Sequence, residues 1–247
     1  MKRSKIEWTD STWNPITGCD HVSNGCQFCY AERMAVRLKA MGSKRYQNGF
    51  KLTVHEDVFE LPLTWKRPQV IFVNSMSDLF HEQLDFAHIE KIFDVMNRAS
   101  WHTFQILTKR PVQLMKYAKR LKWTENIWMG VTVESARYVH RIDALRTVPA
   151  AVRFISFEPL IERVPAESCS LADIHWAIIG GESGPGARPM SEAWVYEIRD
   201  ICRRDEVAFF FKQWGGVNKA AAGRLLDGQT WDEMPNRVRE RIVTRSA

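Results

Sequence analysis

Apolar residues follow two spacings along the chain, and the two alternate. Short runs of consecutive apolar residues, typical of strands buried on both faces, are separated by segments with an apolar residue every three or four positions, typical of amphipathic helices. We expect strands within 6–18 and over 69–75, 103–109, 126–134, 153–158, 176–182 and 207–213. We expect helices over 30–41, 85–99, 111–121, 135–145 and 191–203. Residues 43–69 are polar and broken by glycine and proline, which predicts a long loop with one helical turn.

This alternation predicts the fold class. A strand followed by a helix, repeated along the chain, is the pattern of β-α units around a parallel sheet. About seven such strands in one domain indicate an α/β fold whose sheet forms a β/α (TIM-like) barrel, complete or partly open, rather than a flat doubly wound sheet. We expect a single domain over 1–247, with a core at about 13–215 and a C-terminal extension over 216–247.

The spacing within two helices predicts which of their faces are buried. Residues three and four positions apart lie on the same face of a helix. The residues expected to face the core are Met34, Leu38 and Met41 in the first helix, and Val112, Met115, Ala118 and Leu121 in the helix that begins at Pro111. Asp85 and Ser191 are expected to cap the helices that follow them.

The chain is basic and rich in tryptophan. It has 247 residues, a net charge of +6, a pI of about 9.1 and 10 tryptophans. Positive residues concentrate at 116–122, 203–204 and 237–245. These features are compatible with a DNA or RNA ligand and equally with an ordinary solvated surface. There is no apolar run of roughly 18 residues and no apolar segment after the charged start, so we expect no membrane span, no signal peptide and a cytoplasmic location.

Three of the five cysteines lie in one short segment. Cys19, Cys26 and Cys29 have the spacing C-x6-C-x2-C, and cysteines this close together in an intracellular chain are more often metal ligands than disulfide partners. Three thiolates on one loop can hold three irons of a 4Fe-4S cluster and leave the fourth iron open to a ligand. The alternative is a closed Cys3His zinc site completed by His21. We expect the loop over 43–69 to lie over or beside this segment.

Polar residues follow each predicted strand. In a β/α barrel the carboxyl ends of the strands meet on one face, and that face carries the chemistry. The residues expected there are Asn74, Ser75, Asp78, Thr108, Lys109, Thr132, Glu134, Ser156, Glu158, Glu182, Ser183, Lys212 and Gln213. The cysteine segment follows the first strand and should lie on the same face. Any one of these residues could be a helix cap or a surface charge, but their recurrence after six strands favours a site.

The cysteine segment also resembles a known motif. Cys26-Gln27-Phe28-Cys29 is similar to the C-x-aromatic-C half of the cluster motif of the radical S-adenosylmethionine (SAM) superfamily, which follows the first strand of a β/α barrel. Over roughly 15–215 the chain resembles a phage- and prophage-associated family of radical-SAM-like proteins with three cysteines. The segments that carry this resemblance are 13–15 with the cysteine segment, 77–80, 107–111, 157–160, 180–184 and 211–215.

The resemblance implies cofactors, a partner and site residues. It implies a 4Fe-4S cluster on Cys19, Cys26 and Cys29, with SAM on the fourth iron and an external one-electron reductant of the flavodoxin or ferredoxin type. Reduction would cleave SAM to methionine and a 5′-deoxyadenosyl radical that abstracts hydrogen from a substrate. The residues expected to bind SAM are Asn74, Ser75, Asp78, Thr132, Glu134 and Glu182. The residues expected to be catalytic are Lys109, Glu158, Glu182 and Lys212.

Two features depart from the superfamily pattern. Six residues separate Cys19 from Cys26, whereas the usual number in the superfamily is three. The superfamily's Gly-Gly-Glu follows the second strand, whereas Gly180-Gly181-Glu182 follows a much later one. In chain order, Asn74, Ser75 or Asp78 holds the equivalent place, and Glu182 is expected to face SAM or the substrate from across the barrel.

Three interpretations of the function follow. The first is a radical-SAM enzyme that acts on a nucleic acid or nucleotide, in repair or modification. The second is a zinc-stabilised module that binds nucleic acid or protein without catalysis. The third is an iron–sulfur protein that binds SAM but needs a second protein to act. Cys169 and Cys202 are expected to be ordinary residues, the former in a polar loop and the latter on the buried side of a helix.

Overall fold

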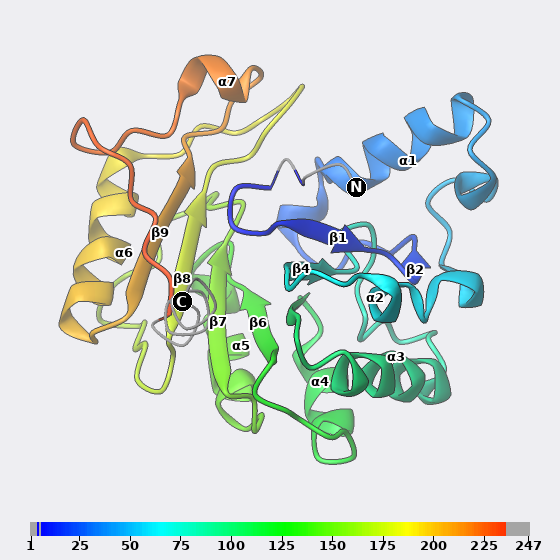
Figure 1. Ribbon diagram of the computed structural model, residues 1–247. Helices are drawn as coiled ribbons and strands as arrows, with labels where there is room; N and C mark the ends of the chain where they lie inside the picture. Colours follow the sequence, from blue (N-terminus) through cyan, green and yellow to red (C-terminus); the bar gives the residue numbers. More distant parts are fainter. Residues whose placement is uncertain (1–3, 5, 236–247) are drawn as a thin grey trace.

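The computed structural model describes residue 4 and residues 6–235, and a seven-stranded parallel sheet forms the centre of this part of the chain (Figure 1). The strands lie in the order β1-β4-β5-β6-β7-β8-β9, so each new strand is added at the same edge. Their bounds are Ser11–Trp13, Val70–Val73, Thr103–Thr108, Ile127–Thr132, Val152–Phe157, Trp176–Gly180 and Ala208–Gln213. A separate antiparallel pair consists of β2 (Ile16–Thr17) and β3 (Thr53–Val54). All the predicted strands are therefore confirmed, with bounds that differ by a few residues.

The sheet curls but does not close. Within the described residues, β1 and β9 are its two edges and no strand pairing joins them. The segment after β9 covers part of this opening, because Asp232 forms an antiparallel bridge with Phe210 of β9. The predicted β/α barrel is thus present in its partly open form. The single domain over 1–247 stays a prediction, and residues 236–247, with the basic stretch 237–245, lie outside the described residues.

Helices cover the outer face of the sheet. Those between successive strands are α3 (Phe86–Arg98), α4 (Pro111–Ala118), α5 (His140–Arg146) and α6 (Glu192–Arg204). Asp85 caps α3 as predicted, since its carboxylate accepts a hydrogen bond from the backbone N–H of Ala87 (3.0 Å), whereas the Ser191 side chain makes no capping hydrogen bond to α6. None of the helices in the described part of the chain is long and apolar enough to span a membrane.

The connection between β2 and β4 is longer than the others. It carries α1 (Tyr30–Ala40), the strand β3, the short helix α2 (Leu61–Thr64) and 3₁₀ turns at Lys44–Tyr46 and Glu56–Val58. The prediction of one helical turn within 43–69 was therefore wrong, because several short elements form there. A further 3₁₀ turn lies within the cysteine segment at Asn24–Cys26, another precedes α5 at Ala136–Tyr138, and α7 (Lys219–Ala222) follows β9.

Aromatic side chains fill the concave face of the sheet near the amino ends of the strands. This inner cluster comprises Trp8, Phe72, Trp128, Val152, Phe154, Trp176, Ile178 and Phe210, and no helical residue belongs to it. Trp8 enters from the segment before β1, with its ring centroid 4.7 Å from that of Phe72. Trp176 donates its indole N–H to the carbonyl oxygen of Glu233 (2.8 Å). One end of the half-barrel is thus filled, which leaves the carboxyl end for a site.

The buried faces predicted for two helices are only partly those that the structure buries. The residues that were expected to be buried but are exposed are Met34 (40%) and Met41 (70%) in α1, and Val112 (69%) and Met115 (45%) in α4. The residues buried in their place are Ala31 and Ala35 in α1, and Leu114 and Tyr117 in α4. The small alanines of α1 allow it to pack closely on Tyr46 and Met76. The prediction for the helix that begins at Pro111 is confirmed for Ala118 (1% exposed) and Leu121 (7%), which are buried with Leu114 and Tyr117.

The two cysteines outside the cysteine segment are both buried. Cys202 lies on the inner side of α6, as predicted. Cys169 lies in a loop with polar neighbours, as predicted, but its side chain is 2% exposed and belongs to the main core. Its neighbours in sequence are polar, but the Cys169 side chain itself packs inward with Leu171.

Candidate functional site

A cavity of about 520 Å³ opens at the carboxyl ends of the strands, which is a size typical of small-molecule sites. Its lining combines residues that follow β4 to β9 with the segment between β2 and α1 that carries the three cysteines. The predicted site residues found in this lining are Cys19, Cys26, Cys29, Asn74, Ser75, Asp78, Lys109, Thr132, Glu158, Glu182 and Lys212. Glu134 is the exception, because it lies behind the lining.

The cysteine loop, residues 18–29, is shaped by two glycines. Gly18 has a φ of +84°, and a Cβ there would lie 2.2 Å from the carbonyl oxygen of Lys51. A Cβ on Gly25 would lie 2.6 Å from Cγ of Glu134. Glycine avoids both clashes and adopts the positive φ without strain. Because Lys51 belongs to the segment 43–69, the prediction that this segment lies beside the cysteines is confirmed.

The thiols of the cysteine loop are perturbed by their surroundings. Burial raises the pKa of Cys19 to about 11, and the carboxylate of Asp78 acts in the same direction. Arg110 opposes this effect, since its Nη2 donates to Sγ of Cys19 at 3.3 Å. Burial also raises the pKa of Cys29, and the neighbouring Cys26 contributes to the shift at both thiols. A metal that binds these sulfurs must displace their protons, so its uptake should increase with pH.

The position of His21 distinguishes two kinds of metal site. A structural zinc site needs four ligands about 2.0–2.3 Å from one ion. Nε2 of His21 instead lies 2.8 Å from Oε2 of Glu32, and both side chains are exposed. Across residues 6–235, no three Cys, His, Asp or Glu side chains are grouped as ligands of a single ion. The contact with Glu32 engages the His21 imidazole, and the three thiols remain as the donors that the cysteine loop offers to a metal or cluster.

Glu134 lies beneath the cysteine loop and is fully buried. Its Oε1 accepts hydrogen bonds from Nζ of Lys109 (2.7 Å) and Oγ of Ser23 (2.5 Å), and its Oε2 accepts one from Nη1 of Arg141 (2.7 Å). Burial acts to raise the pKa of Glu134, but the charges of Lys109 and Arg141 outweigh it, and the pKa lies below its usual value. Glu134 therefore ties the cysteine loop, through Ser23, to the end of β6.

Glu182 restrains the other side of the cysteine loop through Arg188. The Glu182 carboxylate accepts hydrogen bonds from Nη2 (2.6 Å), Nε (2.9 Å) and the backbone N–H (3.0 Å) of Arg188. Burial acts to raise the pKa of Glu182, but the hydrogen bonds from Arg188 outweigh it and lower the pKa. The same guanidinium donates to the carbonyl oxygen of Asn24 in the cysteine loop (3.0 Å). Glu182 lines the cavity, but Arg188 already occupies its carboxylate.

Asp78 fixes the end of β5. Its Oδ1 accepts hydrogen bonds from Oγ1 of Thr108 (2.7 Å) and the backbone N–H of Phe80 (3.0 Å). Its Oδ2 accepts one from the backbone N–H of Lys109 (3.0 Å). Lys109 is thus held at its backbone by Asp78 and at its ammonium group by Glu134. Asp78 therefore fixes the position of the Lys109 backbone.

Five polar atoms of residues in the cavity lining are buried and have no hydrogen-bond partner among the described residues. They are Nε1 of Trp8, Nδ2 of Asn74, Oγ of Ser77, Oε1 of Glu158 and Oε1 of Gln213. Buried polar groups are nearly always hydrogen-bonded, so a ligand or an ordered water is the expected partner. The second oxygen of Glu158 pairs with Nζ of Lys212 at 2.5 Å. This part of the cavity therefore suits a ligand with both donors and acceptors.

The sequence profile of one protein family matches residues 3–235, almost the whole chain. The chain belongs to the DUF5131 family. That family is described as "Protein of unknown function (DUF5131)", a description that names no cofactor, reaction or phage association. Comparison with curated proteins found no match.

Two solved structures are similar to part of this DUF5131 chain. One is "Spore photoproduct lyase complexed with dinucleoside spore photoproduct", with 13% identity and a TM-score of 0.44 over 78% of this chain and 60% of that one. The other is a mutant of spore photoproduct lyase with bound AdoMet and dinucleoside spore photoproduct, with 13% identity and a TM-score of 0.42 over 78% and 61%. This chain thus spans about 60% of the length of those structures. Likeness at this level leaves the function of the chain open.

Several residues that hold the site together were missed by sequence reasoning. Ser23, Arg110, Arg141 and Arg188 each hydrogen-bond to the cysteine loop or to a carboxylate that supports it. Arg141 lies in a helix and Arg188 in a glycine-rich loop, positions where an arginine is ordinarily a surface residue. Of these residues, only Arg110 could have been predicted from the sequence, because it directly follows Lys109 in one of the segments that carry the family resemblance.

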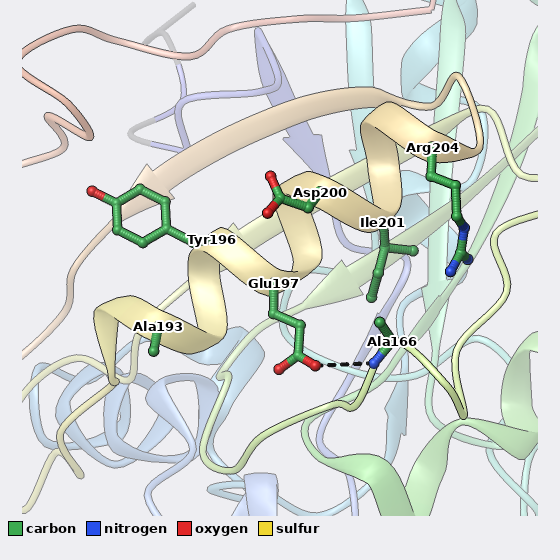
Figure 2. Close-up of a pocket in the computed structure, with 7 residues that line it drawn as sticks. All are labelled: Ala166, Ala193, Tyr196, Glu197, Asp200, Ile201 and Arg204. Carbon is green, nitrogen blue, oxygen red and sulfur yellow. Dashed lines mark hydrogen bonds between the residues drawn. The ribbon is translucent and has the colours of Figure 1, made fainter.

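A second hollow lies on the surface formed by α6 and the segment at Ala166 (Figure 2). None of the predicted site residues lines it. Its most buried acidic side chain is Glu197, whose carboxylate accepts hydrogen bonds from the backbone N–H of Ala166 (3.1 Å) and from Arg163 (2.7 Å). None of the described residues that line this hollow has a buried polar side-chain atom without a hydrogen-bond partner. The strand-end cavity is therefore the candidate site.

Proposed function

We propose that this protein is an iron–sulfur enzyme that binds SAM, cleaves it by one-electron chemistry and uses the radical on a nucleic acid or nucleotide. The observation that carries this proposal is the convergence of the three-cysteine loop and five unpartnered buried polar atoms on one cavity. The cavity lies at the carboxyl ends of parallel strands, which is where the active sites of β/α barrels occur.

Cys19, Cys26 and Cys29 would hold three irons of a 4Fe-4S cluster and leave the fourth iron free for SAM. When bound, the cluster supplies the electron that cleaves SAM to methionine and a 5′-deoxyadenosyl radical. An external protein of the flavodoxin or ferredoxin type would deliver that electron. The chain's own part is to shield the sulfurs, since Cys26 is buried and the other two are half-buried.

The unpartnered atoms match the polar groups of SAM, which carries an amino group, a carboxylate and ribose hydroxyls. Oε1 of Glu158 can accept a hydrogen bond from the amino group or a hydroxyl, and Nδ2 of Asn74 can donate one to the carboxylate or a ribose oxygen. Lys212 holds the other oxygen of Glu158 and so fixes the direction of the free one. Ser75 and Thr132, in the same lining, are proposed as further contacts.

We propose that Glu134, Glu182, Asp78 and Lys109 act as positioning residues. Each of the three carboxylates is occupied by neighbouring donors within the described residues, so none is free to bind a ligand as the cavity stands. Glu134 and Glu182 restrain the cysteine loop from opposite sides, and Asp78 holds the backbone of Lys109. Their effect would be to keep the three sulfurs in place around the cavity.

Anaerobic reconstitution with iron and sulfide, followed by SAM and dithionite, tests the proposal. We expect 5′-deoxyadenosine to form, as measured by chromatography. Cys→Ala at positions 19, 26 or 29 should remove nearly all cluster iron, whereas Cys169→Ala, at a buried cysteine outside the loop, should retain it. Glu158→Gln should retain the iron but bind SAM more weakly. A protein that purifies with zinc, or retains its iron in all three loop variants, would contradict the proposal.

A further inference from the structure

After Glu32 of α1, the segment that follows the cysteine loop carries only positive charge. Residues 33–55 contain six lysines and arginines and no aspartate or glutamate. Two of the six are engaged, since Arg33 donates to the carbonyl oxygen of Ser183 and Arg45 pairs with Asp57. The remaining four, which are exposed and form no ion pair with another described residue, are Arg37, Lys39, Lys44 and Lys51. Such a run of unpaired cations attracts a polyanion.

Helix α1 combines these cations with exposed apolar side chains. Tyr30 is 49% exposed, Met34 40% and Met41 70%. With Arg37 they are spaced i, i+4, i+7 and i+11, so all four lie along one face of the helix. Figure 1 shows α1 apart from α4 and α6, and Tyr30 and Met34 of α1 line the strand-end cavity. A soluble helix ordinarily buries its apolar stripe, so this exposed face is a candidate contact surface.

The positive segment is continuous with the cavity. Met34 and Phe50 of this segment line the cavity, and so does Tyr30, which begins α1 just before it. The hydroxyl of Tyr30 donates to the carbonyl oxygen of Ser75, which also lines the cavity. This hydrogen bond anchors the tip of the Tyr30 side chain while half of its surface stays exposed. A ligand held by the cations would therefore meet a fixed aromatic ring at the cavity edge.

We propose that α1 and the segment up to Lys51 bind the backbone of a single-stranded nucleic acid, with a base stacked on Tyr30. Cations along the backbone and aromatic rings under the bases are the means by which single strands are bound. A single strand suits this site because its bases are free to enter a cavity of about 520 Å³, whereas a duplex would first have to flip a base out. This inference rests on the proposed function, since it names the substrate class of the same site.

Oligonucleotide binding by the reconstituted protein tests the cations. Fluorescence anisotropy would compare labelled single-stranded DNA, single-stranded RNA and the DNA duplex between about 50 and 200 mM salt. The variant Arg37→Gln, Lys39→Gln, Lys44→Gln should reduce the slope of log affinity against log salt by about 2, since each lost phosphate contact removes about 0.7. The control Lys116→Gln, Lys119→Gln, Lys122→Gln removes the same charge from α4 and the residues that follow it, and should leave the slope unchanged.

Tyr30→Leu tests the stacking separately. Loss of a stacked ring should weaken single-strand binding by roughly five- to hundredfold. Because no cation is removed, the salt slope should stay that of the wild type. A fall in affinity with an unchanged slope distinguishes the ring from the cations. Iron content should match the wild type in both the Tyr30 and the triple variants, which separates an effect on binding from a damaged cysteine loop.

Three results would overturn the inference. One is absence of single-strand binding, and another is an equal loss in the α4 control, which would make the effect one of net charge. The third is a stronger preference for the duplex, or for vesicles of anionic lipid, with the same dependence on Arg37, Lys39 and Lys44. Single-strand binding by a protein that forms no 5′-deoxyadenosine would instead uphold the binding surface and contradict the proposed function, so the two failures are distinguishable.

Discussion

The substitution Glu134→Gln tests most directly how Glu134 supports the cysteine loop. It retains the shape of the side chain and removes the one negative charge shared by Lys109 and Arg141. The Arg141 side chain is 3% exposed, so its cation cannot turn to water, whereas that of Lys109 is 22% exposed and can do so in part. The substitution therefore leaves at least one buried charge unpaired.

The loss of stability can be worked out from the number of buried charges left unpaired. Removing one partner of a buried ion pair costs about 3–5 kcal/mol, because the remaining charge stays desolvated. Since Lys109 can recover some hydration, we expect the lower value, about 3 kcal/mol of the free energy of unfolding. For a domain of this size the melting temperature should fall by about 6–12 °C. The cysteine loop also loses its hold through Ser23, so metal retention should weaken about tenfold or more.

Urea unfolding, thermal melts and iron content after reconstitution measure these effects. The control is Glu90→Gln, at an exposed position on α3, which should change the free energy of unfolding by less than about 0.5 kcal/mol. The double variant Glu134→Leu, Arg141→Leu should be less destabilised than Glu134→Gln, because no buried cation is left alone. A Glu134→Gln variant as stable as the control, with wild-type iron, would refute the reasoning.

Three further predictions concern the same site. The folded-state pKa values of Glu134 and Glu182 lie below the usual 4.5, so their stabilising contribution is present above about pH 4.5 and is lost as the pH falls through the folded values; urea unfolding against pH should show this loss, and a flatter curve for Glu134→Gln. Gly25→Ala should lower stability and iron content, because its Cβ would lie 2.6 Å from Cγ of Glu134, and equal iron content would count against that contact. Arg110→Gln removes a hydrogen bond to Sγ of Cys19 and should make the reduction potential of the reconstituted protein more negative; an EPR-monitored redox titration measures this, and an unchanged potential would contradict it.

The order of strands and helices could be predicted because apolar spacing records burial residue by residue. The seven strands occur where apolar runs were found, and the gathering of strand-end residues around one cavity follows from parallel topology. Whether the barrel closes depends on the twist of the sheet and on the segment at Asp232, which pairs with Phe210 of β9. Apolar spacing along the sequence predicts neither of these. The roles of the site residues stay predictions.

Side-chain pairings that apolar spacing does not record explain what could not be predicted about the site. Glu134, Glu158 and Glu182 looked equivalent in the sequence, since each follows an apolar strand. The structure separates them, because Arg141 and Arg188 occupy the first and third carboxylates, whereas Oε1 of Glu158 has no partner among the described residues. The exposure of the apolar face of α1 was not predicted for a similar reason. Amphipathic spacing alone cannot distinguish a helix face that packs on the core from one that is a contact surface.

The most direct test of the central claim is the EPR spectrum of the anaerobically reconstituted and reduced protein, recorded with and without SAM. A cluster on three cysteines with one open iron predicts an iron–sulfur signal that changes shape when SAM is added. A spectrum without such a signal in a chain that carries zinc, or a signal that SAM leaves unchanged, would contradict the account.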